Sequence, residues 1–137
     1  FKYDRSFLNR INGELCIYNT IEIIKRYNPK VYVIENPASS KIWHYVNDIL
    51  NFQIPFDNLA HYNLYNYPLR KPTRFKSNIN LGLRNNHKSK PQQQWEDFSK
   101  SYNERSNIPL ELIVDIYKAV NQYLTNPIGV PSERLLF

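Results

Sequence analysis

The amino-acid sequence predicts an α/β protein, a single domain built around a mixed sheet flanked by helices. A helical pattern runs directly into a short buried-strand pattern, and a second helical pattern follows; this order is typical of α/β folds. Two aromatic strand-like segments and a strongly periodic helix complete the chain. At 137 residues, with 42% hydrophobic and 22% charged residues, the chain is long enough to form a layered core.

The first helix is predicted over residues 14–27. Its apolar residues recur three or four positions apart on one face: Leu15, Tyr18, Ile21 and Ile24. Gly13 precedes this pattern and Pro29 follows it, so we expect the helix to begin after Gly13 and to end before Pro29. The single cysteine, Cys16, lies within the pattern, and we expect a half-buried, unreactive thiol there.

A strand is predicted at residues 31–35, VYVIE, because the segment is β-branched, aromatic and apolar up to its last residue. Such a run is typical of a central strand covered on both faces. Glu35 ends the run, and Pro37 holds Asn36 in extended geometry. Open α/β sheets bind ligands outside the carboxyl ends of their strands, so Glu35 and Asn36 are candidate site residues. The alternative is a solvated or capping glutamate.

The middle of the chain predicts one more helix and two more strands. Ser39 or Ser40 caps a helix that ends near Asn51. Its apolar face consists of Ile42, Val46, Ile49 and Leu50. Residues 59–67 and 74–81 have strand-like composition, and their short connection predicts antiparallel neighbours.

The last third of the chain combines a loop with helices. Residues 82–94 are rich in Gly, Asn, Ser, Lys and Gln, which predicts an exposed loop, and residues 94–102 predict a short helix. A strong helix follows, with Ser106 or Asn107 as its cap and Pro109 in its first turn. Its predicted buried stripe is Ile113, Ile116, Val120 and Leu124. The tail at 128–137 receives no assignment.

Composition excludes several classes of protein. One cysteine rules out an internal disulfide, and three scattered histidines give no zinc-ligand spacing, so no metal site is expected. No apolar run reaches the ~18 to 20 residues that cross a bilayer, and no signal-peptide pattern is present. We therefore expect a soluble, cytoplasmic protein without membrane contact. The chain begins with Phe1 and contains no methionine, which suggests a fragment or a processed product.

Positive charge is concentrated in one part of the chain. The net charge is +6, and no Asp or Glu occurs between Asn58 and Trp95. That stretch contains Arg70, Lys71, Arg74, Lys76, Arg84, Lys88 and Lys90. Aromatic residues interleave with these cations, namely Tyr62, Tyr65, Tyr67 and Phe75. Aromatic faces that stack beside cations favour nucleic-acid binding, and the alternative is a solvated basic face.

Three segments carry a resemblance to a known family. VIENP, at 33–37, resembles the Glu-Asn-Val or Glu-Asn-Pro motif of the DNA (cytosine-5) methyltransferases, especially their compact bacteriophage type. YNYPLRKPTRFKSN, at 65–78, resembles the phage-type segment that stands where other members carry Gln-x-Arg-x-Arg. ERSNIPLELIVDI, at 104–116, resembles the final motif of the family. The three matches follow the order of the family and cover most of the chain.

The resemblance implies a chemistry. In this family a cysteine thiolate attacks C6 of a cytosine flipped out of double-stranded DNA, and C5 then takes a methyl group from S-adenosylmethionine. Glu35, with Asn36 beside it, would place its carboxyl at ring N3 and make C6 electrophilic. The implied fold is a partial Rossmann-like S-adenosylmethionine methyltransferase fold. Residues 1–137 would be the carboxyl-terminal half of a larger methyltransferase domain, acting in the cytoplasm of a bacterial host and possibly phage-encoded.

The resemblance also implies binding residues. The DNA-facing set would be Arg70, Lys71, Thr73, Arg74, Lys76 and Arg84, and Asn107 would open the helix that closes the cofactor site. Residues 82–108 would form the target-recognition region. On the Gln-x-Arg-x-Arg pattern the matching positions are Leu69, Lys71 and Thr73, so the second arginine is missing. Arg70 or Arg74 would replace it.

The chain also departs from the family. Neither the Pro-Cys loop nor the Gly-rich cofactor motif is present, and Cys16 lies in a helical pattern rather than in such a loop. The chain alone should therefore be inactive, with S-adenosylmethionine held mainly by an amino-terminal half, or with self-association through an uncovered sheet edge. The alternative function is a non-catalytic, methyltransferase-derived DNA-binding or inhibitor protein. A nuclease is disfavoured because no Asp precedes a Glu-x-Lys arrangement.

Overall fold

A computed structural model describes residues 5–126 of the chain. The unassigned tail at 128–137 lies outside the described residues. The elements in order are α1 (Arg5–Tyr27), β1 (Val33–Pro37), α2 (Ile42–His44), a π-helical turn η1 (Tyr45–Ile49), β2 (Phe56–His61), a 3-10 turn η2 (Tyr62–Tyr65), β3 (Pro72–Ser77), a 3-10 turn η3 (Trp95–Asp97), α3 (Tyr102–Ser106) and α4 (Leu110–Thr125). None of these helices is long and apolar enough to span a bilayer.

The three described strands form one sheet in the order β1-β3-β2. Both neighbouring pairs are antiparallel, with Glu35 opposite Phe75 in one pair and Asn58 opposite Phe75 in the other. β1 and β2 consequently run parallel to each other, with β3 inserted between them. The predicted combination of a sheet with flanking helices is confirmed, and so is the antiparallel pairing of the two strands predicted at 59–67 and 74–81, although both begin and end earlier. Within the described residues every strand pair is antiparallel, so the mixed sheet that was predicted is not observed.

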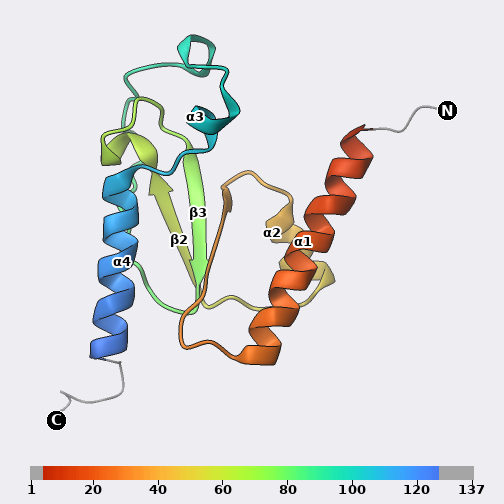
Figure 1. The fold of residues 1–137 in the computed structure, drawn as a ribbon. Helices are drawn as coiled ribbons and strands as arrows, with labels where there is room; N and C mark the ends of the chain where they lie inside the picture. Colours follow the sequence, from red (N-terminus) through yellow and green to blue (C-terminus); the bar gives the residue numbers. More distant parts are fainter. Residues whose placement is uncertain (1–4, 127–137) are drawn as a thin grey trace.

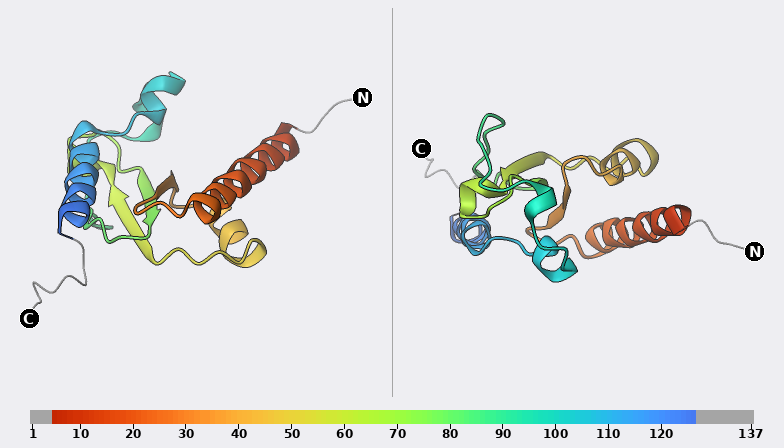
Figure 2. Two further views of the ribbon diagram at one scale, coloured as in Figure 1. Left: turned by 60° about the horizontal axis from the view of Figure 1, so that its bottom comes forward. Right: turned by 90° about the horizontal axis from the view of Figure 1, so that it is seen from above.

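Helices cover both faces of this sheet, so the chain forms three layers. In Figures 1 and 2, α4 lies on one side of the sheet and α1 with α2 on the other. Alternation along β1 sends Val33 to the cluster that contains Leu112 of α4, and Ile34 to the cluster that contains Ile17 of α1 and Trp43 of α2. We call these sides the α4 face and the α1/α2 face.

Helix α1 is longer than predicted. It begins at Arg5 and passes through Gly13 without a break, because one internal glycine costs only about 1 kcal/mol and no other breaker occurs in this stretch. Its buried residues are Ile17 and Ile21. The predicted face was therefore wrong at Leu15 and Tyr18, which are exposed. Cys16 is exposed as well, not half-buried as predicted.

The predictions for β1 and the second helix need correction too. β1 lies at an edge of the described sheet, not at its centre, and it extends to Pro37; an edge strand tolerates proline because its outward amide needs no partner. In the helical segment after it, Trp43 and Val46 are buried, whereas Ile49 is exposed. Since apolar residues occur on more than one side of these segments, periodicity alone does not select the buried face.

Helix α4 begins at Leu110, so Pro109 stands at its N-cap position and not in its first turn, and, contrary to the prediction, neither Ser106 nor Asn107 caps it. The buried stripe is shifted relative to the prediction: Leu112 is fully buried and Ile116, Ala119, Val120 and Tyr123 pack around it. Ile113 and Leu124 are exposed. The segment is apolar at 110, 112, 113 and 114, so its contact face is set by the sheet and not by its own sequence pattern.

The loop prediction is confirmed. Residues 82–94 contain no helix or strand, and the loop projects from the body beyond η2 (Figure 2, right). Asn66, which stands where the family pattern has glycine, adopts a left-handed conformation with φ of 60°. Asparagine tolerates this region better than other residues with a side chain.

Candidate functional site

Three distant segments meet beyond the carboxyl ends of β1 and β2. Glu35 is the middle residue of β1, so it does not end the strand as predicted, because the strand continues to Pro37. Lys71 immediately precedes β3, just beyond the carboxyl end of β1. The Lys71 ammonium donates a hydrogen bond to the backbone carbonyl of Arg105 at the end of α3. The Tyr67 hydroxyl donates to the carbonyl of Glu104 over 3.0 Å. β1 pairs with β3, and the turn before β3 bonds to α3, so the 65–78 segment connects the other two segments that carry the family resemblance.

Strand register decides which face each side chain occupies. Residues directly opposite on antiparallel strands share a face, and so do alternate residues on one strand. Glu35 therefore shares the α4 face with Phe75 and Thr73. Asn36, opposite Arg74, lies on the α1/α2 face. The two candidate residues of the Glu-Asn pair point to opposite sides of the sheet.

Glu35 has the properties of an available acid. Its side chain is exposed and makes no hydrogen bond or ion pair with another residue of the 5–126 range. Surrounding protein atoms nevertheless displace part of its water, which raises the pKa of Glu35, and the positive charge of Lys71 partly opposes that rise. A carboxyl with a raised pKa keeps a larger protonated fraction near neutral pH, as a general acid requires.

Lys71 is held in an unusual backbone conformation. Its φ is 39°, in the left-handed region that side chains other than Asn and Asp rarely adopt. The Thr73 hydroxyl donates to the Lys71 carbonyl over 3.0 Å and so supports this turn. Burial lowers the pKa of the Lys71 ammonium, and the Glu35 charge counteracts that change. A strained residue beside an available carboxyl is typical of a functional site.

The Tyr62 ring packs against the Lys71 ammonium. The Lys71 Nζ atom lies 5.0 Å from the centroid of the Tyr62 ring, and Tyr62 is 0% exposed. Among the described residues the buried Tyr62 hydroxyl makes no hydrogen bond of good geometry; the Thr73 hydroxyl, which donates to the Lys71 carbonyl, is its polar neighbour. Burial raises the pKa of Tyr62 to about 12; Thr73 opposes this rise, and the Glu35 charge adds to it. An unpaired buried hydroxyl calls for a water or a ligand group.

The predicted DNA-facing cations are not all brought together. Arg74 is ion-paired with Asp57, and its Nε donates to the Ala38 carbonyl over 3.3 Å. Lys76 lies 5.1 Å from the centroid of the Trp43 ring. Both cations extend from the α1/α2 face, the side opposite Glu35, because they alternate with Thr73 and Phe75 along β3.

The remaining predicted residues have varied surroundings. Arg84 forms ion pairs with Glu111 at 3.3 Å and Asp115 at 3.5 Å. Arg70 donates to the carbonyl of His87 over 3.0 Å. Asn107 is exposed in the turn between α3 and α4. Of the predicted site residues, only Lys71, Thr73 and Glu35 are therefore neighbours of the Tyr62 side chain.

Sequence reasoning misjudged the aromatic residues. Tyr62, Tyr65 and Phe75, expected to stack on nucleic acid, are buried in the core, and Tyr67 is half-buried. The structural roles of Tyr62 and Arg105 were not foreseen. A signal was present for Tyr62, since it lies two residues beyond Ala60 and so continues the buried side of β2.

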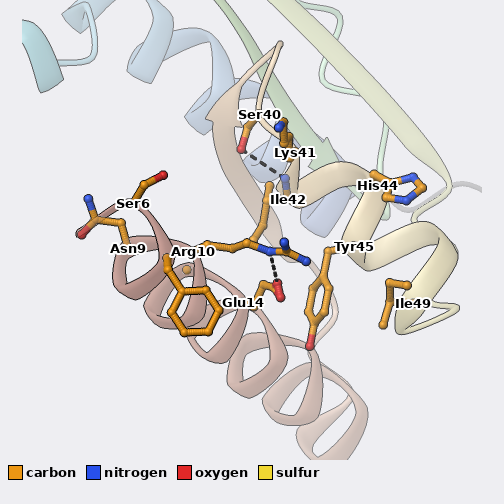
Figure 3. A pocket seen from close by; sticks show the side chains of 12 residues that line it. Ser6, Asn9, Arg10, Glu14, Ser40, Lys41, Ile42, His44, Tyr45 and Ile49 are labelled. Atoms are coloured by element: carbon orange, nitrogen blue, oxygen red, sulfur yellow. Dashed lines mark hydrogen bonds and ion pairs between the residues drawn. The ribbon is translucent and has the colours of Figure 1, made fainter. Parts of the chain in front are cut away.

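A separate hollow of about 670 Å³ lies between the start of α1 and the segment 40–49 (Figure 3). Arg10 and Glu14, joined by an ion pair of 3.1 Å, border it on one side, and Ser40, Lys41 and Tyr45 on the other. It lies on the α1/α2 side and contains none of the predicted site residues. We assign it no role in the chemistry of Glu35.

Comparison with known proteins adds no relative. No family model, curated protein or solved structure matches this chain. Within the part that the structure describes, no group of three His, Cys, Asp or Glu side chains is arranged to hold a metal ion. A functional assignment therefore depends on the motifs and on the geometry around Glu35.

Proposed function

We propose that this chain is part of a DNA (cytosine-5) methyltransferase, its carboxyl-terminal half, and that it is inactive alone. The single observation that supports this most strongly is the meeting of the three family-like segments at one sheet edge, with the Glu35 carboxyl beside Lys71. Double-stranded DNA is the proposed partner. The proposed location is the cytoplasm of a bacterial host, with a phage gene as the proposed source.

In this proposal Glu35 activates the flipped cytosine. The protonated carboxyl donates its hydrogen to ring N3, which withdraws electron density from C6 and prepares that carbon for a nucleophile from the rest of the enzyme. The raised pKa of Glu35 favours the protonated form that this step needs. Asn36 lies on the other face of the sheet, away from the proposed position of the base.

The structure favours Lys71 as the cation beside the base. Arg74, a possible replacement for the missing arginine, lies across the sheet and is paired with Asp57. Arg70 is directed to the loop at His87. Lys71, in contrast, is close enough to Glu35 for each charge to shift the pKa of the other.

S-adenosylmethionine supplies the methyl group in the complete enzyme. In this proposal Asn107, exposed beside the first turn of α4, hydrogen-bonds at the rim of the cofactor. The Gly-rich motif that would hold most of the cofactor is not in the sequence. We therefore propose that an amino-terminal half supplies it.

The sheet topology is compatible with a partial Rossmann-like fold. β1 and β2 run parallel, helices cover both faces, and the antiparallel β3 is of the kind that many doubly wound sheets carry near an edge. The outer edge of β1 has no partner strand within the described range. Parallel strands of an amino-terminal half could add there, or a second copy could pair in their absence.

The test is transfer of a labelled methyl group to duplex DNA by the complete enzyme and by its Glu35→Gln variant. We expect turnover to fall by at least ~100-fold, since general-acid assistance is worth ~10² to 10⁴. Glu14→Gln, which changes a carboxylate on α1, is the matched control and should retain full turnover. An undiminished rate for Glu35→Gln would show that the motif does not act on the base.

The second candidate function is a non-catalytic DNA-binding or inhibitor protein derived from such an enzyme. The observation in its favour is that the only thiol, Cys16, is exposed on α1, on the face of the sheet away from the Glu35 side chain. This candidate predicts DNA affinity that needs no cofactor and no partner half. Complementation with an amino-terminal half that restores methyl transfer would decide against it.

A further inference from the structure

The lysines and arginines of the acid-free stretch fall into two groups by their contacts. Arg74 and Arg84 are ion-paired, Lys71 donates to a carbonyl, and Lys76 lies on an indole. The exposed side chains of Lys88 and Lys90 make no hydrogen bond or ion pair with any residue from 5 to 126. This second group can contact a polyanion without losing an internal interaction, and Arg70, which uses one N–H group on the His87 carbonyl, keeps other N–H groups for the same purpose.

The loop that carries these two lysines is anchored to the body. The Asn86 amide donates to Nδ1 of the buried His61 over 2.7 Å, and the Gln93 amide donates to the Pro68 carbonyl over 3.0 Å. Arg70 adds its bond to His87. Between these anchors the loop extends outward (Figure 2, right). The lysines are thus presented on a fixed support near the turn that contains Lys71.

We propose that Lys88 and Lys90, with the remaining N–H groups of Arg70, form a surface that contacts the phosphates of double-stranded DNA. The surface is formed by residues from the stretch between Asn58 and Trp95, so no carboxylate from that stretch opposes a phosphate. Lysine and arginine contacts to phosphate provide most of the affinity and fix the register of a protein on the duplex. That this surface directs the bound duplex toward Glu35 rests on the proposed function.

The amides of the same loop serve its structure. Asn85 donates to the carbonyls of Leu59 and Leu83, both over 3.2 Å, and the side-chain oxygen of Asn86 accepts from the Lys88 amide over 2.9 Å. Because these groups are occupied, they do not read base edges in this conformation. The role proposed for the surface is therefore to position the duplex through its phosphates.

The experiment measures binding of the chain to a short fluorescent DNA duplex by anisotropy over a range of salt concentrations. We expect the double variant Lys88→Gln, Lys90→Gln to lose about tenfold or more in affinity at low salt and to flatten the log-log salt dependence by roughly 2, since each phosphate contact adds about 0.9. Lys88→Arg, Lys90→Arg should retain the affinity. Thermal unfolding of each variant verifies that the fold is intact.

The matched control removes the same charge elsewhere, with Lys30→Gln, Lys118→Gln; both lysines are exposed and have no described ion pair. Equal losses for the two double variants would overturn the proposal in favour of general charge attraction. Preference for an RNA duplex over the DNA duplex would also overturn it. Glu14→Gln, on α1, should bind as wild type does. The methyl-transfer assay of Glu35→Gln is separate from this binding assay, so failure of the proposed function and failure of this surface are distinguishable.

Discussion

The two faces of the sheet use similar residue types in different ways. On the α1/α2 face each strand cation has an internal partner: Arg74 pairs with Asp57, and Lys76 lies on Trp43. On the α4 face, among the residues from 5 to 126, the Glu35 side chain makes no hydrogen bond or ion pair, the Tyr62 hydroxyl makes no hydrogen bond of good geometry, and Lys71 has a positive φ. The first arrangement stabilises a fold, whereas the second leaves groups available to a ligand.

A charged residue in a basic stretch therefore indicates a function only when its interaction partners in the fold are known. Internal pairs satisfy their own charges, and their removal should affect stability modestly and binding little. Unpaired or strained groups cost stability and remain where they serve a function. The predictions below separate these two cases.

The largest expected effect comes from the core of each face. Leu112→Ala on the α4 face and Ile21→Ala on the α1/α2 face each remove a side chain that is at most 1% exposed, and each should lower the unfolding free energy by about 2 to 5 kcal/mol. Urea denaturation measures both. Leu110→Ala, at a position that is 75% exposed, is the control and should change stability little.

Acid should loosen the loop that carries Lys88 and Lys90. Burial and the nearby charges of Arg70 and His87 lower the pKa of His61 from its ordinary 6.5, and its neutral Nδ1 accepts the Asn86 amide. The folded state therefore binds fewer protons than the unfolded state, so this contribution is present above pH 6.5 and is lost as the pH falls toward the lower folded pKa. Hydrogen exchange of the Asn86 amide, once corrected for the intrinsic rate, should then accelerate. Unchanged protection down to pH 5 would contradict this role.

Tyr62→Phe should have a smaller effect, and of opposite sign. The substitution removes a buried hydroxyl that has no described partner, so the unfolding free energy of the isolated chain should rise by about 1 kcal/mol. In the complete enzyme the same change should reduce turnover if a substrate or a bound water uses that hydroxyl. A clear loss of stability in the isolated chain would mean that the hydroxyl is already hydrogen-bonded.

Arg74→Ala should have the smallest effect. Both side chains of the Arg74 and Asp57 pair are about a third or more exposed, so solvent and salt screen the attraction, and the expected loss is below about 1 kcal/mol. DNA affinity should remain close to that of wild type. A loss of affinity as large as that of the Lys88 and Lys90 double variant would assign Arg74 to the DNA surface after all.

Sequence patterns predicted whether a segment is a helix or a strand better than they predicted which of its residues are buried. Spacing of apolar residues located α4, and the short connection predicted the pairing of β2 with β3. The buried faces of α1 and α4 were not predictable, since both helices carry apolar residues on several sides and only the sheet decides which side is covered. The edge position of β1 was not predictable, because a continuous apolar run does not distinguish a strand at the edge of a sheet from one at its centre.

The candidate site was predictable only in part. Motif order indicated that Glu35 and the turn at Lys71 belong together, and the structure places them close enough to affect each other electrostatically. The separation of Arg74 and Lys76 from Glu35 follows from strand alternation, but it requires the bounds and register of β3. The unpaired hydroxyl of Tyr62 depends on three-dimensional contacts that no spacing encodes.

The most direct test of the central claim is an NMR titration of the Glu35 carboxyl in the chain itself and in its Lys71→Met variant. If Glu35 lies partly desolvated beside the Lys71 ammonium, its pKa will exceed the ordinary 4.5 in the wild type and will rise further when the positive charge is removed. A Glu35 that titrates at its ordinary value in both proteins would contradict the juxtaposition on which the proposed cytosine activation depends.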